Sequence, residues 1–137
     1  MTGFTGGCLC GAIRFRVGGD VVRTANCHCD DCRKATGASF ATNVFVNEAD
    51  LTILQGTPKS FDHEADSGAT MTKQFCGNCG TQLFGKGSRS AGVLHVKVGA
   101  IDDAGFVRPA IDVFVSRKLP FIRLSDETEH FEQGRRR

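Results

Sequence analysis

Residues 26–34 read NCHCDDCRK and place three of the chain's seven cysteines within six positions. Alternate side chains of an extended segment share one face, so Cys27 and Cys29 point the same way and Cys32 returns to them at the following turn. We therefore expect these three sulfurs to converge on one point. His28 points away from its two neighbours in this arrangement, so we expect it at the surface or behind the sulfurs rather than among the metal ligands.

The other four cysteines form two close pairs, Cys8 with Cys10 and Cys76 with Cys79. The sequence CGNCG at residues 76–80 is typical of a zinc knuckle, in which glycines let the backbone curl so that amide N–H groups face the sulfurs. We predict that the two pairs join into one four-sulfur zinc site, which would clip the N-terminal strand to the middle of the chain. Three thiolates, by contrast, leave one position of a tetrahedral zinc ion open to water or substrate.

Two alternatives for the cysteines stay open. In the first, one zinc ion occupies the four-sulfur site and the other three cysteines are free, reactive thiols. In the second, disulfides form, which would leave one of seven cysteines unpaired. The N-terminus lacks the basic flank and apolar run of a signal peptide. Clustered cysteines that stay reduced are typical of a reducing compartment, so we expect a cytoplasmic protein.

Apolar alternation predicts a mainly β fold with at most short helices. With 137 residues, 17 of them glycine and none of them tryptophan or tyrosine, the chain fits one domain with many tight turns. We assign residues 1–125 to a single zinc-binding domain and residues 126–137 to a polar, flexible tail. The predicted strands cover residues 13–17, 21–25, 39–46, 51–54, 60–63, 69–75, 93–98 and 111–115, with a turn at residues 18–20.

One short helix is predicted over residues 30–36, with an aspartate cap at its start and Gly37 at its end. Cys32 would then lie near a helix N-terminus, where the dipole favours the thiolate. Arg33 and Lys34 add positive charge beside the sulfurs, and either could also contact a substrate carboxylate. The alternative, that both are ordinary solvated residues, is equally compatible with the sequence.

The charge balance does not call for nucleic acid or a membrane as a partner. The formal net charge is +2, but it falls to −1 when seven thiolates and two zinc ions are counted. No stretch approaches the roughly 18 apolar residues that a membrane-spanning helix needs.

Three motifs follow one another along the chain: GCLCG at residues 7–11, CHCDDCR at 27–33 with TGASF at 36–40, and FCGNCGT at 75–81 with LF at 83–84. Together they resemble the glutathione-dependent formaldehyde-activating enzyme family, whose domain is shared with centromere protein V. The resemblance covers residues 7–115 and implies several small coiled β-sheets stapled by zinc. It also implies a structural zinc ion on Cys8, Cys10, Cys76 and Cys79 and a catalytic zinc ion on Cys27, Cys29 and Cys32.

The resemblance implies the addition of the glutathione thiol to formaldehyde as the reaction, and it implies the class of carbon–sulfur lyases. Two positions depart from the family pattern: Asp112 stands where a histidine is common, and Phe121 stands where a tryptophan is common. If these positions shape the substrate pocket, the thiol or the aldehyde differs from glutathione and formaldehyde. Alternatives from other classes are a non-catalytic, zinc-stabilised module that binds protein or nucleic acid, supported by the arginines at residues 135–137, and a thiol redox or metal-handling protein.

Overall fold

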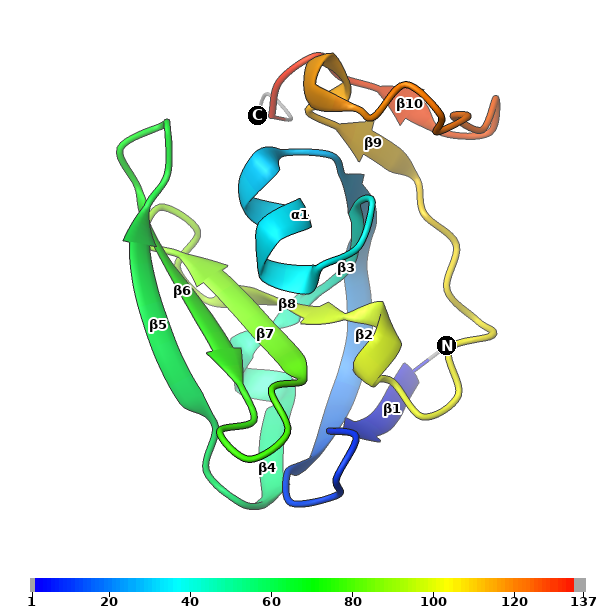
Figure 1. Ribbon diagram of the computed structural model, residues 1–137. Helices are drawn as coiled ribbons and strands as arrows, with labels where there is room; N and C mark the ends of the chain where they lie inside the picture. The colour runs from blue at the N-terminus through cyan, green and yellow to red at the C-terminus, as the bar shows by residue number, and fades with distance from the viewer. Residues whose placement is uncertain (1, 135–137) are drawn as a thin grey trace.

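The computed structural model describes residues 2–134, which form a mainly β structure with one short α-helix (Figure 1). Eight strands follow one another by hydrogen bonding in the order β10, β9, β2, β3, β8, β7, β6 and β5, and β1 and β4 both pair with β2. The predicted mainly β class is confirmed. The arginines at residues 135–137 lie outside the described residues, and so does Met1.

Strand β2 (Arg14–Cys27) organises the molecule because its two halves belong to different sheets. Its first half pairs with β1 (Thr2–Gly7) and β4 (Leu51–Gln55). Its second half pairs with β3 (Ala41–Asn47) and with β9 (Ile111–Val113). The strand therefore carries the chain from the first cysteine pair directly to Cys27.

The predicted turn at residues 18–20 is wrong, since β2 runs through it without reversing. Gly19 serves close packing instead. A Cβ atom on Gly19 would collide with the carboxylate of Asp50, which lies in the 3-10 turn Glu48–Asp50. The change of pairing partner is accommodated by a register shift between Val21 and Arg23.

The remaining predicted strands are present, with ends that differ from the prediction by at most two residues. Strand β3 is central, as its two apolar faces predicted, because it lies between β2 and β8 (Val93–Lys97). The antiparallel strands β5 (Lys59–Glu64), β6 (Thr70–Phe75) and β7 (Gln82–Gly87) extend the sheet from β8. Strands β1, β7 and β10 (Glu129–His130) were not predicted. Strand β10 pairs in parallel with β9, within the segment assigned as a tail.

The main hydrophobic core lies where β2, β3, β7 and β8 face one another. Phe15 and Phe84 are fully buried there, with ring centroids 4.9 Å apart in an edge-to-face arrangement. A second, smaller cluster joins Cys27, Cys32 and Ala41 to Val113 and Phe114. Two further 3-10 turns, Val98–Ala100 and Val115–Arg117, follow β8 and β9.

Helix α1 (Asp30–Thr36) is present as predicted and lies between the β5–β6–β7 strands and the β2–β3 strands (Figure 1). The predicted aspartate cap is wrong: the Cys29 sulfur accepts the hydrogen bond from Cys32 N at 3.3 Å. Asp30 instead pairs with Arg33. Gly37 ends the helix in the left-handed conformation, with φ of 70°, as predicted.

No helix in residues 2–134 is long and apolar enough to cross a membrane.

Candidate metal centres

The structure brings together the four sulfurs of Cys8, Cys10, Cys76 and Cys79, which we call the quartet. All four lie within 4.8 Å of one another. The first two come from the loop between β1 and β2, and the other two come from the knuckle between β6 and β7. Leu9 N donates to Thr81 Oγ1 at 3.0 Å and so links the two loops directly. This convergence matches the predicted pairing of the cysteines across a long span of chain.

Backbone N–H groups face the quartet's sulfurs, as the knuckle sequence predicted. Ile13 N donates to Cys8 Sγ at 3.2 Å, and both Asn78 N and Cys79 N donate to Cys76 Sγ at 3.4 Å. The Thr81 hydroxyl lies 3.2 Å from Cys79 Sγ and helps to lower the pKa of this thiol to about 5. Such donors stabilise thiolate charge, so the donor set suits a tetrahedral zinc ion.

The structure also brings together Cys27, Cys29 and Cys32, which we call the trio, with sulfurs within 4.8 Å of one another. The first ends β2, the second caps α1 and the third lies in the first turn of that helix. Among residues 2–134, no further Cys, His, Asp or Glu ligand atom joins this group. Three soft ligands with a fourth position left free fit a zinc ion that can accept an additional ligand.

Two nearly buried lysines that the sequence analysis missed, Lys73 on β6 and Lys97 on β8, lie close to the trio. The pKa of the Cys32 thiol is lowered to about 3, first by hydrogen bonds with the sulfurs of Cys27 and Cys29 and then by the positive charges of Lys97 and Lys73. Burial in turn lowers the pKa of Lys97, whose ammonium donates to Asn43 Oδ1 at 2.9 Å. A lysine within an alternating strand pattern gives no sign in the sequence that it faces a cysteine cluster.

The two predicted substrate contacts lie on α1 in different environments. Arg33 is held by Asp30 at 2.7 Å, whereas Lys34 is exposed. The positive charges that lower the pKa of Cys32 belong to Lys73 on β6 and Lys97 on β8.

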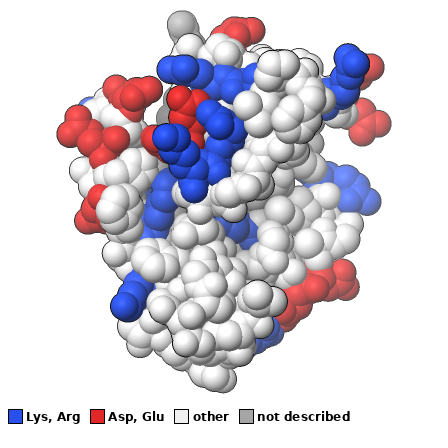
Figure 2. All heavy atoms as spheres, viewed as in Figure 1, with Lys and Arg blue, Asp and Glu red and all other residues white. Residues whose placement is uncertain are grey.

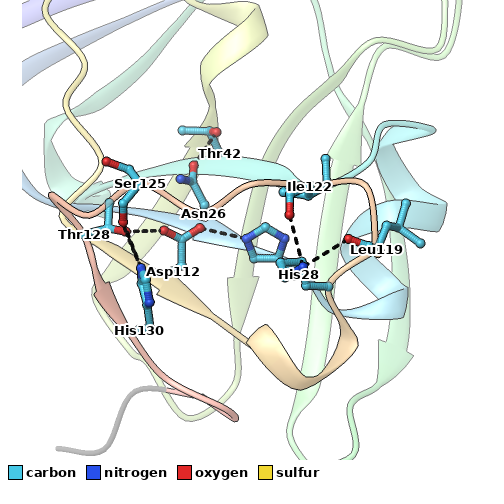
Figure 3. Close-up of polar contacts among 10 residues, drawn as sticks. Asn26, His28, Thr42, Asp112, Leu119, Ile122, Ser125, Thr128 and His130 are labelled. Carbon is cyan, nitrogen blue, oxygen red and sulfur yellow. Dashed lines mark hydrogen bonds and ion pairs between the residues drawn. The ribbon is translucent and has the colours of Figure 1, made fainter.

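His28 is buried behind the trio, where it forms a chain of polar contacts with Asp112 and Thr128 (Figure 3). Its Nε2 lies 2.7 Å from Asp112 Oδ1, and Thr128 Oγ1 donates to Asp112 Oδ2 at 2.6 Å. His28 N also donates to Val113 O, and the imidazole packs against Phe40. The predicted surface position of His28 is therefore wrong: the ring is buried and has Asp112 as its partner.

Two cavities flank α1. The larger, of about 470 Å³, lies between the helix and strands β5 to β7 and is lined by Asp31, Lys34, Ala35, Phe61, His63, Lys73, Phe75 and Gln82. The smaller, of about 300 Å³, is lined by Arg33, Lys34, Gly37, Ala38, Ser39 and Leu119. Neither Asp112 nor Phe121 is among these lining residues, and Phe121 is 70% exposed. Basic side chains gather on this face of the molecule (Figure 2).

Comparison with known proteins gives one consistent match. The family model described as "Glutathione-dependent formaldehyde-activating enzyme" matches residues 3–117. A Halomonas elongata protein named "Putative glutathione-dependent formaldehyde-activating enzyme" is 33% identical over 102 residues, which cover 71% of this chain and 64% of that protein. An Aspergillus flavus protein of the same name is 29% identical over 121 residues, which cover 82% of this chain and 62% of that protein.

This chain thus spans about three fifths of the length of the curated relatives it matches. A crystal structure of a Rhodobacter sphaeroides protein superposes with a TM-score of 0.57 and 22% identity, over 77% of this chain and 91% of that one. That structural match supports the fold alone.

Proposed function

Because this chain belongs to the glutathione-dependent formaldehyde-activating enzyme family, we propose that it is a zinc-dependent enzyme of the carbon–sulfur lyase type. Its substrates in this proposal are adducts of glutathione, or of a similar small thiol, with formaldehyde or another small aldehyde. One observation carries the proposal: the trio has no fourth protein ligand among residues 2–134, and it lies beside a helix flanked by cavities. The seven free cysteines suit a reducing compartment such as the cytoplasm.

The reaction forms one bond between the thiol sulfur and the aldehyde carbon, and the thiol proton ends on the aldehyde oxygen. It needs no oxidant and no reductant. A zinc ion held by Cys27, Cys29 and Cys32 would supply a lowered pKa for a thiol placed at the fourth position.

The chain's own residues would offset the negative charge of the trio and hold its three cysteines in place. Three thiolates around a divalent ion leave a net charge of −1, which Lys73 and Lys97 offset from β6 and β8. The bond from His28 to Asp112 holds the backbone between Cys27 and Cys29 against β9. The Cys29 sulfur, which caps α1, fixes the helix relative to the strand that carries Cys27.

We assign the quartet a structural zinc ion, so that the chain would hold two zinc ions. The quartet ties the loop before β2 to the knuckle between β6 and β7, and it offers four sulfurs, the number of ligands that a structural zinc ion takes, with backbone donors on two of them. A closed site of this kind contributes to folding, while an open site is available to substrate.

The proposal is tested by the rate of adduct formation from glutathione and formaldehyde, measured by NMR against the spontaneous reaction. We expect wild-type protein to exceed the spontaneous rate and Cys29→Ser to lose at least about a hundredfold of that excess, the scale of a lost metal ligand. Lys86→Met on β7, which removes a solvent-exposed charge paired with Glu48, is the control and should retain wild-type activity. Equal rates for wild type and Cys29→Ser, or no rate above the spontaneous one, would remove the assignment.

A further inference from the structure

The larger cavity contains buried polar groups that have no partner in the described residues. Lys73 is 8% exposed, and no residue in 2–134 pairs with its ammonium. Gln82 Oε1 and His63 Nε2 are also buried without a hydrogen-bond partner. Buried polar groups in folded proteins are nearly always satisfied, so these two unpartnered atoms in one cavity wall, beside Lys73, indicate a missing partner.

The charge of the cavity favours an anionic partner. Lys73 lies in its wall and Lys34 is exposed at its edge, whereas Asp31 is the one acidic residue among those that line it. The Asp31 carboxylate lies 3.9 Å from His63 Nδ1, so it faces the histidine. A carboxylate that enters the cavity would therefore meet more positive than negative charge.

The other lining residues and the size of the cavity favour a ligand that joins its carboxylate to an apolar or peptide-like portion, which we call the stem. Phe61 and Phe75 contribute aromatic surface, and Phe61 is 60% exposed. The volume of about 470 Å³ falls within the range of sites for small organic ligands. The Gln82 amide could meet an amide group of such a stem.

The position of the cavity connects it with the trio. Helix α1 supplies three of the lining residues from the same turns that carry Cys32. Asp31 and Ala35, which line the cavity, lie one residue before and three residues after Cys32 on this helix. A ligand whose sulfur reaches the trio can therefore extend into the cavity.

We propose that this cavity binds the carboxylate-bearing end of a small, peptide-like thiol, with Lys73 as the charged contact. Phe61 and Phe75 cover the stem, and Gln82 pairs with an amide group. The inference rests on the proposed function and deepens it, because it assigns the part of the substrate that is recognised apart from the sulfur.

The test uses S-methylglutathione, whose sulfur has no proton to lose, so that its binding reports on the cavity rather than on thiolate coordination. Calorimetric titration of wild-type, zinc-loaded protein should give a dissociation constant at least about tenfold lower than for the dimethyl ester of the same compound, as expected for a hydrogen bond to a charged group. Equal affinities for the acid and the ester would overturn the proposal. This comparison needs no variant and so does not depend on the folding of one.

Variants then locate the contact. Compared at equal zinc occupancy, Lys73→Met should weaken S-methylglutathione binding by about tenfold to a hundredfold, and Lys73→Arg should restore much of the loss. Lys34→Met should weaken it by about threefold or less, because its ammonium is solvated. Lys86→Met, on the neighbouring strand, should bind as the wild type does. Wild-type affinity in folded Lys73→Met would overturn the assignment of Lys73.

Failure of this inference differs from failure of the proposed function. Binding of S-methylglutathione that depends on Lys73, without turnover of glutathione and formaldehyde, would remove the enzymatic proposal and leave the cavity assignment standing. Turnover that depends on Cys29, with S-methylglutathione binding indifferent to Lys73 and to esterification, would do the reverse.

Discussion

The quartet and the trio are built from the same ligand type but differ in their surroundings. The quartet joins two loops that are distant in sequence, and backbone N–H groups donate to its sulfurs. The trio is formed within six residues at the junction of β2 and α1, with two nearly buried lysines close by. The comparison teaches that the number of sulfurs and the charge around them, rather than the kind of ligand, separate a site that staples the fold from one suited to chemistry.

The largest expected effect is on stability and comes from breaking the quartet. Cys76→Ser should lose one zinc ion and destabilise the fold by on the order of 5 kcal/mol or more, because the closed site ties β6 and β7 to the loop before β2. Thermal unfolding followed by circular dichroism, with zinc measured per chain, checks this. Cys29→Ser is the matched variant in the trio and should cost far less stability. If the two serine variants unfold alike, the division into a structural and an open site is contradicted.

A smaller effect is expected from the polar chain behind the trio. Asp112→Ala leaves the buried His28 ring without its carboxylate, so it should destabilise the fold by about 1–3 kcal/mol. Thr128→Val removes the outer contact of the same chain and should cost about 1 kcal/mol. Denaturant unfolding measures both. Asp112→Ala should also lower zinc occupancy of the trio more than that of the quartet, and an equal loss at both sites would show that His28 does not position the trio.

The smallest effect concerns an ion pair that contributes to the fold without metal. Arg14 donates to Asp102, and Thr5 Oγ1 adds a bond of 2.8 Å. The Arg14 guanidinium and the Thr5 hydroxyl lower the pKa of the Asp102 carboxyl to about 2 from the ordinary 3.8. A lowered pKa in the folded state means that this stability is present above the ordinary pKa and is lost as the pH falls from about 4 to about 2.

Asp102→Asn should therefore cost at most about 1 kcal/mol at neutral pH, since both partners are more than one third exposed. Its unfolding free energy should also depend less on pH between about 4 and 2 than that of the wild type. Unfolding curves at several pH values measure both quantities. A variant with the same acid dependence as the wild type would show that Asp102 contributes nothing to it.

The two metal centres could be predicted from the sequence to different degrees. Short spacings such as those of Cys27, Cys29 and Cys32 fix local geometry, so the trio and the knuckle follow from neighbouring residues alone. The pairing of Cys8 and Cys10 with the knuckle rested on elimination among seven cysteines, and the topology supports it. The cap by Cys29 was not predicted, because nothing in the sequence distinguishes a cysteine whose sulfur caps a helix from one whose sulfur does not.

The residues around the trio could not be predicted, because they arrive through long-range pairing. Lys73 and Lys97 face Cys32 only because β6 and β8 belong to the sheet that α1 packs on. Asp112 reaches His28 through the parallel pairing of β9 with β2. Residues 18–20 were predicted to turn, because a glycine needed for close packing, such as Gly19, cannot be told in sequence from a glycine needed for chain reversal.

The most direct test of the difference between the two centres is zinc content per chain combined with X-ray absorption of the bound zinc, before and after glutathione is added. We predict two zinc ions per chain, with an average sulfur coordination below four that rises toward four when the thiol occupies the open position of the trio. One zinc ion per chain, or a coordination that glutathione leaves unchanged, would contradict the account.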